Sequence, residues 1–180
     1  MLTQDDQATL LQIARQALDA RVHRAPAMPV VHGDGVLATA CGAFVSIHCR
    51  GALRGCLGRI TADLPLTDVV SHLAAVVADS DPRFEPVRAD ELDEIAIEIS
   101  VLTPEREARS LDDIEVGRHG LIVEHGHRRG LLLPQVATEH RWNAQEFVEH
   151  TCLKAGLPTD AWRHGARLFV FEAEVFGEVI

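Results

Sequence analysis

Two hydrophobic periods divide the chain into predicted helices and strands. Residues 3–22 place Leu10, Ala14 and Leu18 at helical spacing, which predicts an amphipathic helix. Residues 94–102, "EIAIEISVL", alternate between hydrophobic and polar positions and predict a strand with one face in the core. The first pattern suits a helix that packs on a sheet, and the second suits the sheet beneath it.

A β-hairpin is predicted between residues 35 and 60. The segment "GVLATACGAFVSIHC" predicts one strand, "RGA" a tight turn and "LRGCLGRI" the returning strand. The returning strand carries two internal glycines, which usually mark a bulge, a bend or a close approach to the backbone. With a three-residue turn, the facing pairs are His48 with Arg54 and Ser46 with Cys56. A turn of two residues would reverse the facing of the returning strand.

The rest of the pattern adds helices and strands without a regular βαβ rhythm. It predicts a helix opened by Asp63 and Pro65, two strands within 119–135, a helix from Asn143 to Gly156 and a last strand over 167–179. We therefore expect an α+β fold, with a mixed or mainly antiparallel sheet flanked by helices, in a single domain over 1–180 that could form two lobes.

Composition and charge exclude several classes of protein. Of 180 residues, 47% are hydrophobic and 24% are charged, as in an ordinary soluble domain. The formal charge of −10 opposes binding to a phosphate backbone, so no nucleic-acid partner is expected. The acidic N-terminus and the lack of an apolar run near about 18 residues indicate no membrane span and a cytoplasmic protein. Four cysteines without a CxxC pair are expected to stay reduced there.

The glycine-containing strand is the strongest candidate for chemistry. Arg54 would favour the thiolate of Cys56, and His48 could act as its base. Arg54 could also contact an anionic group, while Gly55 and Gly58 would admit a substrate to the backbone. The alternative is a small buried cysteine whose glycine neighbours make room for a helix.

Other clusters offer weaker signals. His119, His125 and His127 lie near a predicted turn but lack the paired spacing of zinc ligands, so no metal site is expected. Glu98 shares a strand face with Ser100, and its position suits a solvated edge better than the wall of a cleft. No phosphate-binding glycine loop or dinucleotide motif is present, and no cofactor can be assigned.

Several stretches, taken in order, resemble the AMMECR family, the A component of the AmmeMemoRadiSam system in bacteria and archaea. They are "LRGCLG" (53–58), "DPRFEPV" (81–87), "EIAIEISVLTP" (94–104), "GRHGLIV" (117–123), "GLLLPQVATEHRW" (130–142) and "CLKAGLP" (152–158). The hexapeptide is close to the family's signature, with Leu57 where isoleucine is common. The family's motif positions fall here on Arg54, Gly55, Cys56, Gly58, Asp81, Arg83, Phe84, Ser100, Gln135, Glu139, Trp142 and Lys154.

The resemblance implies a larger lobe with an antiparallel sheet, a smaller lobe and a cleft near the signature. It implies a Memo-like protein and a radical SAM protein as partners, but no particular reaction. The favoured hypothesis is a small enzyme or substrate-handling component that uses Cys56, with ligand contacts expected at Ser46, Asp81 and Arg83. The alternatives are a non-catalytic adaptor for those partners, which an exposed apolar patch near the signature would favour, and a nucleic-acid binder, which the net charge opposes.

Overall fold

The computed structural model describes residues 2–30 and 33–178, which form two compact units. The first unit contains the described residues up to Leu102 and those from Glu174 onward, and the second is Thr103–Ala173. Each unit combines helices with a four-stranded sheet, so the predicted α+β class is confirmed. Within the described residues, no helix has both the length and the apolar character needed to cross a membrane.

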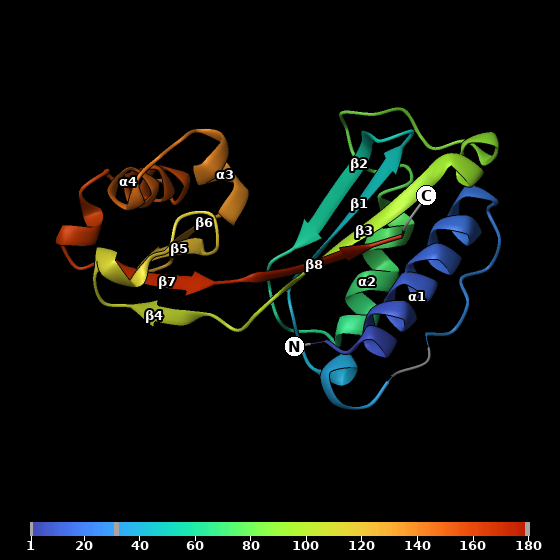
Figure 1. The fold of residues 1–180 in the computed structure, drawn as a ribbon, viewed down its shortest axis with the longest axis horizontal. Helices are drawn as coiled ribbons and strands as arrows, with labels where there is room; N and C mark the ends of the chain where they lie inside the picture. The colour runs from blue at the N-terminus through green and yellow to red at the C-terminus, as the bar shows by residue number, and fades with distance from the viewer. Residues whose placement is uncertain (1, 31–32, 179–180) are drawn as a thin grey trace. The chain divides into compact units, whose positions relative to one another are not determined.

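The first unit is a sheet with two helices on one of its faces (Figure 1). Its strand order is β2-β1-β3-β8, and both β2 and β3 run antiparallel to β1. Its elements are α1 (Gln4–Val22), β1 (Ala43–Cys49), β2 (Ala52–Arg59), α2 (Leu66–Val76), β3 (Ile95–Leu102) and β8 (Ala173–Gly177), with short 3₁₀ turns at Gly35–Ala38 and Ala89–Glu94.

The core of the first unit follows the two hydrophobic periods. The predicted N-terminal helix is confirmed, and Thr3 caps it through a capping box with Asp6. The buried side chains come from one face of each helix and one face of the sheet, and they include Leu10, Leu18, Val45, Ile47, Val69, Leu73, Ile97 and Ile99. Alternation along β1 and β3 therefore sends the intervening side chains to the sheet face that the helices do not cover.

The second unit has the strand order β4-β7-β5-β6, with antiparallel pairing throughout. Its elements are β4 (Arg106–Ala108), β5 (Gly120–His125), β6 (Arg128–Leu132), α3 (Pro134–Glu139), α4 (Ala144–Lys154) and β7 (Arg167–Phe171), with 3₁₀ turns at Leu111–Asp113 and Ala161–Arg163. The predicted cap of α4 is confirmed, because Asn143 accepts a hydrogen bond from the Glu146 N–H at 2.9 Å.

Four details of the predicted pattern are wrong. The last strand is two strands, β7 and β8, which belong to different sheets and part at Glu172. The strands therefore form two separate sheets, where one sheet was predicted. The segment after Leu133 is a short helix, because Pro134 fits the first helical turn. The first strand of the hairpin begins at Ala43, since the residues before it include a 3₁₀ turn.

Candidate functional site

The β1–β2 hairpin turns in two residues rather than the predicted three. Arg50 and Gly51 have φ angles of 52° and 80°, as in the tight turns that match the twist of a hairpin. Cys49 therefore pairs with Ala52. A β-bulge follows at Arg54, which is an extra residue between the pairs His48–Leu53 and Ile47–Gly55. The bulge shifts the register back by one position.

The bulge brings Ser46 opposite Cys56, as predicted, although the turn was predicted incorrectly. The Ser46 Oγ hydroxyl donates a hydrogen bond to Cys56 Sγ over 3.2 Å, and both residues are half-buried. His48, however, lies opposite Leu53 and not Arg54. The predicted facing of His48 and Arg54 is wrong, because the two-residue turn pairs His48 with Leu53 and Arg54 is the unpaired residue of the bulge.

Asp81 and Arg83 hold the backbone of Cys56 from outside the sheet. The Cys56 N–H donates to Asp81 Oδ2 over 2.9 Å, and Arg83 Nη2 donates to the Cys56 carbonyl over 3.4 Å. Asp81 is only 4% exposed and accepts further bonds from Arg83, whose guanidinium holds the pKa of that carboxyl far below its usual range. Because β2 is an edge strand, this pair takes the place of a neighbouring strand at Cys56.

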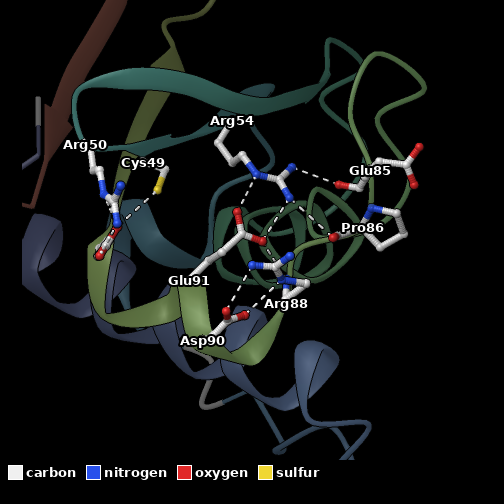
Figure 2. A network of polar contacts seen from close by, with 9 residues as sticks. Cys49, Arg50, Arg54, Glu85, Pro86, Arg88, Asp90 and Glu91 are labelled. Atoms are coloured by element: carbon white, nitrogen blue, oxygen red, sulfur yellow. Dashed lines mark hydrogen bonds and ion pairs between the residues drawn. The ribbon is translucent and has the colours of Figure 1, made fainter.

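Arg54 lies in a polar network with Glu91 and the carbonyls of Glu85 and Pro86 (Figure 2). Its guanidinium donates two hydrogen bonds to the Glu91 carboxylate, at 2.9 and 3.0 Å, and two to the carbonyls of Glu85 and Pro86. Glu91 accordingly raises the pKa of Arg54. A guanidinium has five N–H donors, so four are used within the protein and little of Arg54 is left for an anionic ligand. Its visible role is to fasten the segment 85–91 to β2.

The two glycines of β2 make room for protein side chains. A Cβ at Gly55 would lie 3.1 Å from Val77 Cγ2, beside the end of α2. A Cβ at Gly58 would lie 2.1 Å from the Phe44 ring, which covers this position from β1. Helix packing at Gly55 and the aromatic ring at Gly58 account for the missing side chains without any need for a ligand.

The sheet face that the helices leave uncovered carries a row of chemical groups. Ser46 lies opposite Cys56 on one side and opposite Glu98 of β3 on the other. We call the surface formed by Ser46, His48, Cys56, Glu98 and Ser100 the polar face; all five residues are half-buried. Glu98 was not among the predicted site residues. The alternation with Ile97 and Ile99 predicted which face of the strand carries Glu98. The sequence did not show that β3 is an inner strand of the sheet rather than an edge strand.

The remaining thiols lie in different surroundings. Cys49 is half-buried, and its Sγ lies 3.8 Å from the Glu94 carboxylate (Figure 2). Cys41 and Cys152 are buried, and burial raises the pKa of both thiols. Among the four cysteines, Cys56 is distinguished by a sulfur that accepts a hydrogen bond from a hydroxyl group, that of Ser46.

The clustered histidines do not form a common site. The buried His119 accepts the Glu115 N–H at Nδ1 over 3.0 Å, whereas His125 and His127 are exposed at the β5–β6 turn. Across residues 2–30 and 33–178, no three His, Cys, Asp or Glu side chains are grouped to hold a metal ion. A pocket of about 630 Å³ lies elsewhere in the first unit, where α1, α2 and the residues after Ala25 meet. No pattern in the sequence predicted this pocket.

Comparisons with known proteins agree with the motif pattern. A family model described as AMMECR1 matches residues 11–176. A protein from Methanothermobacter thermautotrophicus is 43% identical over 98% of this chain and 96% of its own length. One from Thermofilum pendens is 42% identical over 98% of this chain and 92% of its own length. The crystal structure of the uncharacterized protein PH0010 from Pyrococcus horikoshii has a TM-score of 0.77 and 38% identity, over 94% of this chain and 89% of that one.

Proposed function

This chain belongs to the AMMECR1 family, and we propose that it is a small enzyme or substrate-handling component in which Cys56 reacts with or binds the substrate. The observation that carries the proposal is the hydrogen bond from Ser46 Oγ to Cys56 Sγ over 3.2 Å. A hydroxyl that donates to sulfur stabilises negative charge on it, and a thiolate is the reactive form of cysteine.

The surroundings of Cys56 support a positioned thiol. Its backbone N–H and carbonyl are both engaged by Asp81 and Arg83, so the residue is fixed from one side while Sγ meets Ser46 on the other. Reactive groups are most effective when neighbouring contacts hold them in place. In this proposal Asp81 and Arg83 act as positioning residues and do not contact the ligand.

The test compares two serines on the polar face. Ser46→Ala removes the donor to Cys56, whereas Ser100→Ala removes a hydroxyl opposite Phe44 on the same face. We expect Ser46→Ala to slow alkylation of Cys56 by iodoacetamide several-fold near pH 7, with the rate followed on the Cys56 peptide by mass spectrometry. Ser100→Ala should leave it unchanged. Equal rates in all three proteins would argue against an activated thiol.

The resemblance of the chain adds partners to the proposal: a Memo-like protein and a radical SAM protein, with which it would act in the cytoplasm. A second candidate function, a non-catalytic adaptor for the same partners, is favoured by apolar exposure beside the signature. Leu53, the first residue of the signature, and Ile60, two residues after its end, are 42% and 44% exposed. They lie near the two ends of β2, and an edge strand with exposed apolar side chains can pair with another chain.

Co-purification distinguishes the two candidates. If the chain is an adaptor, Leu53→Asp should abolish co-purification with the partners while the alkylation rate of Cys56 stays the same. Val175→Asp is the matched control, because Val175 is 56% exposed on β8 at the other edge of the sheet. If Cys56→Ser retains every partner and Cys56 proves inert, the adaptor function is the better account.

A further inference from the structure

Glu98 differs from the carboxylates that pair with the arginines around the hairpin. The guanidinium groups of β2, its turn and the following loops are each paired with a carboxylate: Arg50 with Glu94, Arg54 with Glu91, Arg59 with Asp63, Arg83 with Asp81 and Arg88 with Asp90. Glu98 has no such partner among the described residues. Its carboxylate therefore leaves an uncompensated negative charge on the polar face.

The position of Glu98 places this charge within reach of a ligand held at Cys56. Ser46 separates the two residues in the row, and strands are about 4.8 Å apart, so their Cα atoms are roughly 10 Å apart. On the far side, β8 offers Gly177, where a Cβ would lie 3.6 Å from Glu98 Cβ. The absence of a side chain there leaves that flank of Glu98 uncrowded.

A half-buried carboxylate without a protein partner favours a cationic partner. We propose that the substrate handled at Cys56 is an amine-bearing small molecule, whose protonated nitrogen pairs with Glu98 while its thiol-reactive atom lies at Cys56 Sγ. This inference rests on the function proposed for Cys56. It replaces the anion contact expected at Arg54 with a cation contact on the polar face. It also sets a separation of about 8–10 Å between the protonated nitrogen and the thiol-reactive atom of the substrate.

The test uses two thiol reagents that differ in charge. Aminoethyl and sulfonatoethyl methanethiosulfonate each form a mixed disulfide with a thiolate and release methanesulfinate, but the group delivered is cationic in one and anionic in the other. The readout is the ratio of their rates at Cys56 in the full chain, resolved by peptide mass spectrometry. Glu98→Gln is compared with Glu85→Gln, which removes the same charge from the segment over β2.

We expect the cation-to-anion rate ratio in wild-type protein to fall about fivefold or more in Glu98→Gln, because Coulomb's law gives about a fivefold change for charges about 8 Å apart even at the dielectric constant of bulk water. Glu98→Asp, which keeps the charge, and Glu85→Gln should retain most of the ratio. Raising the salt concentration to about 1 M should reduce the wild-type ratio, and this measurement needs no variant.

The outcomes separate the inference from the function on which it rests. A reactive Cys56 whose rate ratio is the same in wild type and Glu98→Gln, or is insensitive to salt, would overturn the cation contact and leave the thiol function standing. A Cys56 that reacts with neither reagent in any of these proteins would overturn both.

Discussion

Asp81→Asn tests whether the buried carboxylate holds the edge strand at Cys56. The substitution keeps the size of the side chain but removes its charge and replaces one acceptor oxygen with an NH₂ group. Asp81 accepts four hydrogen bonds, from the Cys56 N–H and from the backbone and side chain of Arg83. The new NH₂ group must face one of these donors, so at least one bond is lost and the ion pair disappears.

The structure sets the size of the expected effect. Hydrogen bonds to a charged group contribute about 1.5–3 kcal/mol each when buried, and Asp81 is 4% exposed. The side chain of Arg83 is 57% exposed and can turn into water, so no buried charge is left stranded. We therefore expect Asp81→Asn to lower the free energy of unfolding by about 2 kcal/mol, below the 3–5 kcal/mol of a broken buried pair.

Urea unfolding at pH 7 measures this change, with Asp90→Asn as the matched control. Asp90 also pairs with an arginine two residues away, but both side chains are exposed, at 70% for Asp90 and 73% for Arg88. Exposed pairs contribute little, so this variant should keep the wild-type unfolding midpoint. The reasoning is refuted if both variants shift the midpoint equally, or if Asp81→Asn does not shift it.

The pH dependence of the stability difference between wild type and Asp81→Asn tests whether the ionised carboxylate causes that difference. Arg83 holds the pKa of Asp81 below its unfolded value of about 3.9, so folding favours the ionised carboxyl. Its stabilisation is therefore fully present above about pH 5 and is lost as the pH falls through the lowered pKa. The gap in stability between wild type and Asp81→Asn should narrow below about pH 4, and a gap that stays constant down to pH 2 would exclude the ionised pair as its source.

Three further substitutions test other contacts. Gly58→Ala should lower the free energy of unfolding by about 1–3 kcal/mol, because the new Cβ would meet the Phe44 ring. In a Phe44→Ala background the loss should be less than half as large, which a double-mutant cycle followed by urea unfolding would show. Arg54→Lys should speed hydrogen exchange in residues 85–91 about tenfold, since lysine cannot reproduce the four guanidinium contacts; unchanged exchange would contradict their role. Asn143→Ala should remove about 1 kcal/mol by uncapping α4, and an unaltered unfolding midpoint would count against the cap.

The sequence predicted the elements where one period or one cap dominated. The alternation of Ile95, Ile97 and Ile99 gave the strand and its buried face, and Asn143 gave the start of α4. These signals are local, because a strand face depends on alternate residues and a cap on residues three apart. Glu98 was assigned to the correct face for the same reason.

Register and strand order depend on contacts that no local pattern records. The pairing of Ser46 with Cys56 was predicted from a three-residue turn, but it arises from a two-residue turn and a bulge that cancel each other. The two-residue turn places His48 opposite Leu53, and the bulge leaves Arg54 unpaired with β1, where it bonds to Glu91, a residue distant in the sequence. Likewise, residues 167–177 look like one continuous strand in the sequence, but they divide at Glu172 into β7 and β8, which belong to different sheets.

The central claim is that Cys56 presents a usable thiol in the folded protein, and site-resolved alkylation of the native chain tests it most directly. Iodoacetamide labelling of the four cysteines, followed peptide by peptide with and without denaturant, should modify Cys56 in the folded protein. Cys41 and Cys152, which are buried, should react at the rate of unfolding. If Cys56 reacts only when Cys152 does, it is a packed core residue and the proposed thiol function is contradicted.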